Sequence, residues 1–208
     1  MGFSYNLIQY RVAFDFGSIE YLAGGSDRQK RAYLALRELD LFPSLASWTN
    51  EEMELGIGST LAGSIPLDLA VGDSDLDIVT FAKDTKQIAA LFREKFSGMQ
   101  NFSSSRGIIL GTATLLTKFD FGGETFEIFT QNVPLPQQNA VVHMLVEERL
   151  LILGGASFRE KVMELRHQGM KTEPAFGQVL GLEEPYRELL QLEELSDSEL
   201  RIRFSSCF

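Results

Sequence analysis

Apolar and polar residues alternate along this chain with two different periods, one typical of β-strands and one typical of amphipathic helices. The period of two predicts strands over 10–16, at the end of 55–62, over 76–81 and over 107–116. The same alternation continues on both sides of Gly122-Gly123 and predicts a hairpin there. Residues 97–105 are more polar, and we expect a loop.

The helical period predicts α-helices over 28–41, 85–96, 136–153, 157–167 and 183–195. A further helix is expected to start at Lys171, with Thr172 as its N-cap. Residues 196–208 suggest a tail or a terminal strand. On the first helix, Arg28, Lys30, Arg31 and Arg37 are interpreted as a solvated face. Strands concentrate before residue 133 and helices after it.

The overall composition narrows the class of protein. The 208 residues are 44% hydrophobic and 23% charged, as in ordinary globular domains. A formal net charge of −10 disfavours a general nucleic-acid binder, because such a protein needs a basic surface to neutralise phosphates. The only cysteine is Cys207, so no intrachain disulfide can form. Without a signal-like N-terminus or an apolar run of membrane length, we expect a cytoplasmic protein with no membrane partner.

The residues with the clearest chemistry lie between Gly63 and Asp77. A small Gly63-Ser64 turn is followed, ten residues later, by Asp75 and Asp77 on either side of Leu76. Strand residues two apart point to the same face, so the two carboxylates project together. They repel each other unless a cation lies between them, and such oxygen ligands suit Mg²⁺ with bound phosphates. The pattern therefore predicts a metal site for phosphoryl chemistry.

Two further features bear on this site. Glu127 lies in the second arm of the predicted hairpin, on the face opposite Phe126 and Ile128. A lone strand glutamate is usually exposed, whereas a two-metal site requires a third carboxylate of this kind. The mostly apolar helix over 136–153 carries a polar stripe of Asn139, His143 and Glu147. This stripe is equally compatible with an internal hydrogen-bond network and with the lining of a substrate cleft.

Gly63-Ser64, the Asp75-Leu-Asp77 pair and Glu127 together resemble the signature of the polymerase-β-like nucleotidyltransferase superfamily, especially its minimal bacterial branch. From about residue 21 to residue 192 the chain resembles more closely a bacterial domain family of unknown function within that superfamily. This second resemblance rests on the segments Arg28-Gln-Lys-Arg-Ala-Tyr, Ser74-Asp-Leu-Asp-Ile, Phe126-Glu-Ile-Phe, Gln138-Asn-Ala, His143-Met, Glu147 and Gly169-Met-Lys-Thr-Glu-Pro-Ala-Phe. Residues 1–20 form an extra N-terminal segment that the family does not require.

The resemblance implies an α+β fold, in which a small mixed sheet flanked by helices forms an α/β core at 1–133. A helical C-terminal region at 134–208 would pack on this core. Asp75, Asp77 and Glu127 would hold two Mg²⁺ (or Mn²⁺) ions, one on the triphosphate and one on the attacking hydroxyl. Gly63 and Ser64 would receive a phosphate. Lys171 and the stripe of Asn139, His143 and Glu147 are candidates for nucleotide or acceptor contacts.

The implied activity is transfer of a nucleoside monophosphate from an NTP to an unknown acceptor hydroxyl. Two alternatives remain open. One is a non-catalytic module on the same fold that binds a nucleotide or a protein partner. The other is a two-metal phosphohydrolase.

Overall fold

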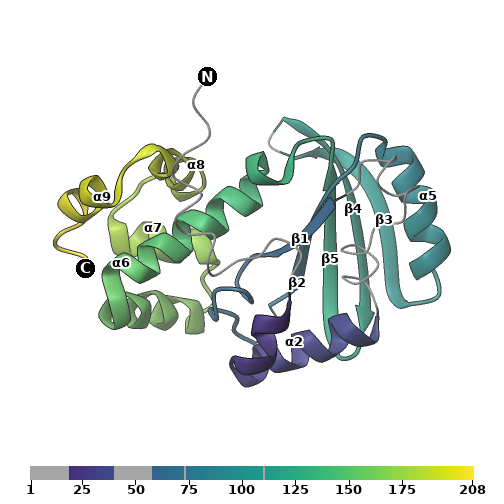
Figure 1. The fold of residues 1–208 in the computed structure, drawn as a ribbon, viewed down its shortest axis with the longest axis horizontal. Coiled ribbons are helices and arrows are strands. Elements are labelled where there is room, and N and C mark those ends of the chain that lie inside the picture. Colours follow the sequence, from purple (N-terminus) through teal and green to yellow (C-terminus); the bar gives the residue numbers. More distant parts are fainter. Residues whose placement is uncertain (1–18, 40–57, 73, 110) are drawn as a thin grey trace.

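The computed structural model describes residues 19–39, 58–72, 74–109 and 111–208. In this part of the chain five strands form one sheet in the order β1-β2-β5-β4-β3 (Figure 1). The strands are Gly58–Ala62 (β1), Leu76–Phe81 (β2), Gln100–Ile109 (β3), Thr112–Phe121 (β4) and Glu124–Gln131 (β5). Strands β2 and β5 pair in parallel and the other pairs are antiparallel. The expected α+β fold with a small mixed sheet is confirmed.

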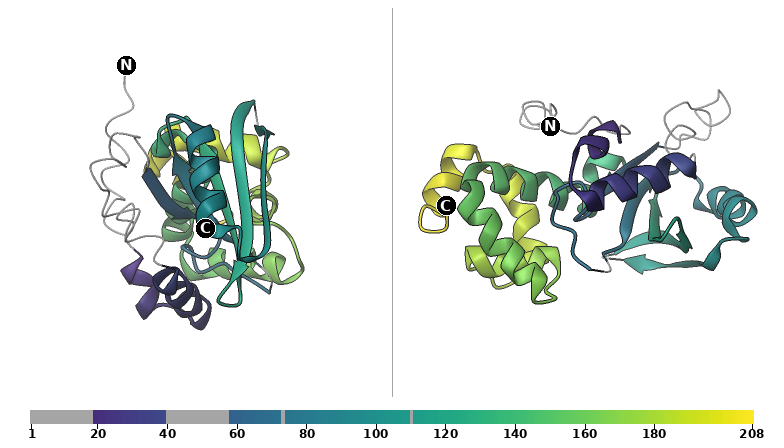
Figure 2. Two further views of the ribbon diagram at one scale, coloured as in Figure 1. Left: turned by 90° about the vertical axis from the view of Figure 1, so that its right-hand side faces the viewer. Right: turned by 90° about the horizontal axis from the view of Figure 1, so that it is seen from below.

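Two helices, α2 (Asp27–Glu38) and α5 (Thr85–Phe96), pack on one face of the sheet, and a short 3-10 turn, η1 (Glu20–Gly24), precedes α2. After β5 another 3-10 turn, η2 (Leu135–Gln137), leads into the long helix α6 (Asn139–His167). The chain ends with α7 (Thr172–Leu180), α8 (Pro185–Gln191), the turn η3 (Leu192–Glu194) and α9 (Asp197–Arg203). Figure 2 shows α7 to α9 at one end of the molecule and the sheet with α5 at the other, with α6 running between them.

The alternation along the strands explains the core under α2 and α5. In the middle of β2, β4 and β5 alternate residues turn toward these helices and are buried, such as Ile78, Phe119 and Phe126. At its centre Phe119 stacks between Phe96 and Phe126, with ring centroids 4.7 and 5.0 Å away. The opposite face of the same strands carries the predicted carboxylates, and the candidate site lies there.

Replacing Phe119 by alanine should lower the free energy of unfolding by about 3–5 kcal/mol, because a fully buried aromatic ring is lost and a cavity remains. Urea denaturation followed by circular dichroism measures this change. The matched control is Leu34→Ala on α2, where the side chain is 65% exposed and we expect less than about 0.5 kcal/mol. A loss below about 1 kcal/mol for Phe119→Ala would contradict this account of the core.

A second core joins α6 to the C-terminal helices. It contains Phe158, Phe176, Leu189 and Leu200, all fully buried. Helix α6 changes direction at Gly155, where the backbone is not helical (φ 64°, ψ −157°). The interruption expected between the helices at 136–153 and 157–167 is thus confirmed as a kink, and α6 begins at Asn139 rather than at residue 136.

Several local predictions were wrong. Residues 100–105, expected in a loop, belong to strand β3. The single strand expected over 107–116 is divided between the end of β3 and the start of β4. The cause is that β3 is an edge strand with exposed residues on both faces, so it lacks the apolar alternation of a half-buried strand. The C-terminal residues form α9 instead of a strand, because Ser196 and Glu199 make a capping box. Thr172 is the first residue of α7, and Lys171 is its N-cap.

The first helix also differs from its prediction in one residue. Lys30, Arg31 and Arg37 are exposed as expected, whereas the side chain of Arg28 is only 14% exposed and forms an ion pair with Glu124. The predicted strand over 10–16 lies outside the described residues. Within the described residues, no helix has the length and apolar character needed to cross a membrane.

Candidate functional site

The sheet register brings the predicted carboxylates to one face. Asp77 on β2 is paired in parallel with Glu127 on β5, and Lys118 on β4 is paired with Glu127 from the other side. Asp75 lies just before β2, two residues from Asp77. Because paired residues on neighbouring strands project from the same face, these charged groups form one row across three strands. Glu127 is buried and the two aspartates are half-buried.

The carboxylates carry an excess of negative charge. Burial, followed by repulsion from Glu127 and Asp75, raises the pKa of Asp77 to about 7. Burial also raises the pKa of Asp75, helped by a hydrogen bond and repulsion from Glu127. The Lys118 ammonium donates to Glu127 Oε1 in an ion pair, and this bond raises the pKa of Lys118. Acids that hold their protons this firmly favour a cation as a neighbour.

Gly63 stands against these acids at the end of β1. Its φ is +73°, in the left-handed region, and a Cβ built there would lie only 3.0 Å from Asp77 Cγ. Both the conformation and the close approach require glycine. The next residue, Ser64, is buried, and its carbonyl accepts a hydrogen bond from the Leu69 N–H (2.9 Å). The Gly63-Ser64 turn is thereby held beside Asp77.

A groove of about 350 Å³ continues the row of carboxylates along the sheet. Val79 and Phe129 lie two residues beyond Asp77 and Glu127 on the same face and form part of its floor. Its far wall comes from the helical part. The wall residues are Asn139, Ala140 and His143 of α6, Glu173 of α7 and Tyr186 of α8. The groove is therefore enclosed by the sheet on one side and by three helices on the other.

The polar stripe of α6 divides between two environments. Asn139 and His143 line the groove. The His143 ring is held by the Tyr186 carbonyl (2.9 Å from Nε2) and lies 3.6 Å from Glu173 through Nδ1. Glu147 does not line the groove. It is 2% exposed, and burial followed by repulsion from Glu173 raises its pKa well above the usual value.

Lys171 is exposed at the N-cap of α7. Its charge opposes the upward shift of the pKa of both Asp75 and Asp77, so it lies within electrostatic range of the two carboxylates. The structure thus brings Gly63, Asp75, Asp77 and Glu127 together, with Lys171 within electrostatic range of the two aspartates.

Two charged residues of this site were missed from the sequence. Lys118 is as far before Gly122-Gly123 as Glu127 is after it, so the predicted hairpin already contained the pairing of these two side chains. Glu173 raises the pKa of both Asp77 and Glu147 and lines the groove. Its sequence neighbourhood gives no comparable signal, because its place depends on how α7 packs against α6.

The donor chemistry suits a hard divalent cation, since three carboxylates project from adjacent strands and two of them have a raised pKa. In the described part of the chain, however, no three His, Cys, Asp or Glu side chains are gathered closely enough to hold a metal ion. Lys118 engages Glu127 instead. The residue types therefore fit Mg²⁺ or Mn²⁺, and a cation held by all three carboxylates would replace Lys118 as the partner of Glu127.

Comparisons with solved structures agree with the fold. The chain is similar to the Cid1 poly(U) polymerase bound to MgATP, with a TM-score of 0.52 and 16% identity over 78% of this chain and 53% of that chain. It is also similar to Cid1 in a study of its RNA terminal uridylyl transferase activity, with a TM-score of 0.51 and 14% identity over 84% of this chain and 52% of that chain. At this identity the likeness shows a nucleotidyltransferase fold alone, and the chain spans about half the length of these proteins.

Comparison with curated proteins found no match. A family model described as "Domain of unknown function (DUF4269)" matches residues 46–192. The matched segment ends where the resemblance ended but begins later than residue 21, so helix α2 lies outside it.

Proposed function

We propose that this chain, which belongs to the family described as a domain of unknown function (DUF4269), is a metal-dependent nucleotidyltransferase. It would move a nucleoside monophosphate from an NTP to the hydroxyl of an acceptor. One observation carries the proposal: Asp77 and Glu127 are paired on parallel strands, with Asp75 beside them, at the end of a groove in a nucleotidyltransferase fold.

Asp75, Asp77 and Glu127 would hold Mg²⁺ or Mn²⁺. When bound, such ions neutralise phosphate charge and lower the pKa of a hydroxyl. The Gly63-Ser64 turn would receive the triphosphate, because glycine lets the backbone approach a phosphate closely. Lys171 would contribute positive charge from the helical side of the groove.

The groove would receive the base and ribose of the nucleotide. Its floor is apolar at Val79 and Phe129, while Asn139, His143 and Glu173 supply polar atoms on the wall. The acceptor oxygen would bond to the α-phosphorus while the bond from this phosphorus to pyrophosphate breaks. The hydroxyl proton would leave to a carboxylate of the site or to solvent. We also propose that 1–133 and 134–208 are the two units between which this groove lies.

The test is transfer of radiolabel from α-³²P-labelled NTPs. We expect label to appear in an acceptor only with Mg²⁺ or Mn²⁺, and to be absent with EDTA. The acceptor panel should contain oligonucleotides, small metabolites, cell extract and the protein itself. If no acceptor in this panel is labelled, the catalytic proposal fails. Release of phosphate or pyrophosphate without a labelled acceptor would indicate a phosphohydrolase instead.

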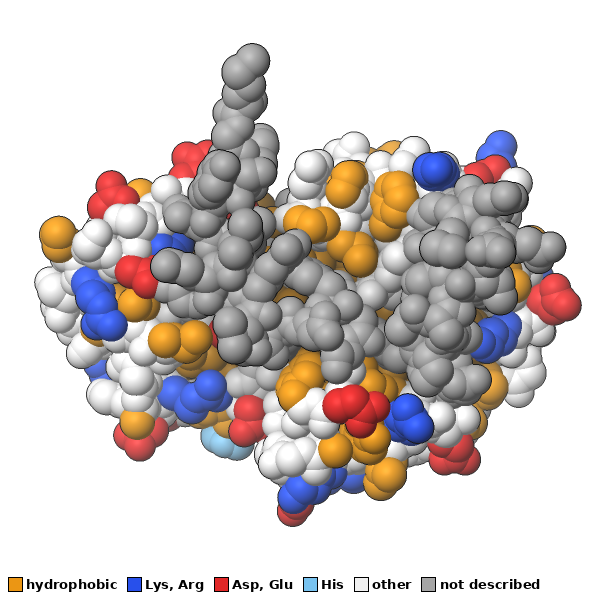
Figure 3. Space-filling view, viewed as in Figure 1, with side chains coloured by type: hydrophobic (Ala, Val, Ile, Leu, Met, Phe, Trp, Pro, Cys, Tyr) orange, Lys and Arg blue, Asp and Glu red, His pale blue; other side chains and the backbone are white. Residues whose placement is uncertain are grey.

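A second candidate is a nucleotide-binding module without catalysis. The ion pair between Lys118 and Glu127 favours it, because a carboxylate neutralised by lysine is a weaker metal ligand. On the face of the molecule that Figure 3 shows, basic and acidic side chains are interspersed where residues are coloured, which suits a small ligand better than a polyanion. Calorimetric titration with an NTP in the presence of EDTA separates the transferase from the binding module. If the NTP binds without metal and Asp77→Ala does not change its affinity, the result supports the module.

A further inference from the structure

The loop that joins β1 to β2 carries two residues of the candidate site, Ser64 at one end and Asp75 at the other. Helix α2 holds this loop at two points. Arg28 Nη2 donates to the Ser74 carbonyl (2.7 Å), and Gln29 Nε2 donates to the Ile65 carbonyl (3.0 Å). These contacts join residues far apart in the sequence, so they are tertiary and not part of a local turn.

Helix α6 holds the same loop from the opposite side. Arg166 Nη2 donates to Ser74 Oγ (3.2 Å), and Arg166 Nε donates to the Leu69 carbonyl (3.2 Å). Ser74 also closes its own turn, because its N–H donates to the Val71 carbonyl (2.9 Å). Ser74, the residue directly before Asp75, is thus bound by one guanidinium from each side.

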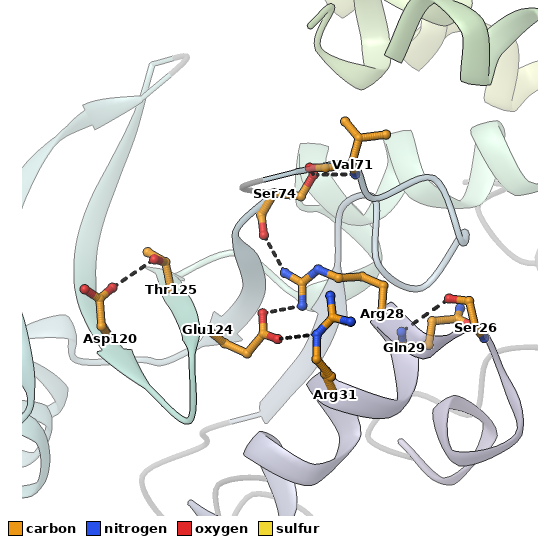
Figure 4. Close-up of polar contacts among 9 residues, drawn as sticks. All are labelled: Ser26, Arg28, Gln29, Arg31, Val71, Ser74, Asp120, Glu124 and Thr125. Carbon is orange, nitrogen blue, oxygen red and sulfur yellow. Dashed lines mark hydrogen bonds and ion pairs between the residues drawn. The ribbon is translucent and has the colours of Figure 1, made fainter. Parts of the chain in front are cut away.

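Of the two contacts from α2, the one made by Arg28 also reaches a strand of the sheet. Figure 4 shows its guanidinium between the Ser74 carbonyl and the carboxylate of Glu124 at the start of β5. The side chains of Arg28 and Glu124 are 14% and 4% exposed. A planar fork of donors can serve two acceptors on separate segments at once, and a lysine cannot do so in the same way. Arg31, one turn further on, is 61% exposed and 4.0 Å from Glu124.

The bond to Ser74 acts on Asp75 through covalent geometry. The peptide unit is planar, so the Ser74 carbonyl oxygen and the Asp75 nitrogen and Cα lie in one rigid plane. A donor that fixes this oxygen fixes the plane from which the Asp75 side chain departs. We propose that Arg28 is a positioning residue that orients Asp75 for cation binding, with Glu124 as its anchor. This inference rests on the proposed metal role of Asp75.

Three variants of the full chain separate this role from simple charge loss. Arg28→Met combined with Glu124→Gln removes the Ser74 contact without leaving a buried charge alone. Glu124→Gln by itself removes the negative charge, but the amide oxygen of the glutamine can still accept a hydrogen bond from Arg28, so Arg28 stays anchored and keeps its contact with Ser74. Arg31→Met removes a cation from the same helix that does not contact the loop. Urea denaturation of each confirms that it folds before the other measurements.

The first measurement is Mn²⁺ binding by electron paramagnetic resonance. Residues that support metal ligands typically change affinity about 10- to 100-fold when they are replaced. We expect a loss in that range for the double variant and less than about threefold for Glu124→Gln and Arg31→Met. In the labelling assay, a raised Mg²⁺ concentration should restore the activity of the double variant, because Arg28 acts on metal binding and not on the nucleotide.

The second measurement is hydrogen exchange in peptides that cover 70–78, which needs neither metal nor activity. The double variant should exchange faster there than Glu124→Gln does. Equal exchange in these two variants overturns the inference. If wild-type protein does not bind Mn²⁺, the metal role of Asp75 fails, and this inference fails with it. If it binds Mn²⁺ but labels no acceptor, only the proposed transferase activity fails. The Mn²⁺ affinity and the hydrogen exchange of the variants then still test the positioning role of Arg28.

Discussion

Asp77→Asn is expected to lower metal-dependent nucleotide transfer by at least about a thousandfold, since a carboxylate that binds the metal contributes several kcal/mol to the transition state. The same change should stabilise the protein when no metal is present. Asp77 has a pKa of about 7, raised by burial and by the neighbouring Glu127 and Asp75. An asparagine carries no charge to bury.

The sign and the pH window follow from that pKa. In the unfolded chain the Asp77 carboxyl loses its proton near pH 4, and in the folded protein near pH 7. Wild-type stability therefore falls as pH rises between these values. The advantage of Asp77→Asn should be absent near pH 4 and complete above pH 7, at roughly 2–4 kcal/mol.

The control for this experiment is Asp27→Asn, at an aspartate that is 94% exposed on α2. Added Mg²⁺ should raise the melting temperature of wild type and Asp27→Asn at pH 8 but not that of Asp77→Asn. Transfer activity above about one tenth of wild type in Asp77→Asn would exclude the assigned role, because losing a metal ligand lowers the rate of transfer by far more than tenfold.

Elements with strong periodicity were predicted closely from the sequence. The bounds of β2 and α5 agree with the structure, because buried residues recur with the strand period in one and with the helix period in the other. Most of strand β3 was predicted as a loop, since an exposed edge strand needs no apolar alternation. Helix α9 was missed because its start depends on the capping box of Ser196, a short polar signal.

The candidate site was predictable only in part. The shared face of Asp75 and Asp77 follows from strand geometry, but the parallel pairing of Asp77 with Glu127 depends on how two separate strands meet. Pairing within a hairpin is local, so Lys118 could have been placed opposite Glu127. The contact of Arg28 with Ser74 spans 46 positions, and an arginine on a helix looks the same in sequence whether it is solvated or buried.

Glu147→Gln is expected to remove much of the pH dependence of the free energy of unfolding that does not come from Asp77. Glu147 is fully buried, and its Oε1 has no hydrogen-bond partner within the described residues. Burial and the charge of Glu173 raise its pKa well above the usual value, and the charge of Arg166 only partly opposes them. A raised acid pKa means that the folded state keeps a proton that the unfolded chain releases. Stability should thus fall as pH rises above about 4.5.

At pH 8 we expect Glu147→Gln to be more stable than wild type by at least about 1.4 kcal/mol, because folding raises the pKa of Glu147 well above its usual value and each unit of that rise costs about this much. At pH 4 the two should be similar, because both then carry a neutral side chain. Urea denaturation between pH 4 and pH 8 measures the difference, with Glu164→Gln, an exposed position of α6, as the control. Some slope should persist from Asp77 and Glu148, whose pKa values are raised to about 7. Parallel stability curves for wild type and Glu147→Gln would mean that Glu147 keeps an ordinary pKa, paired with Arg166 as a carboxylate.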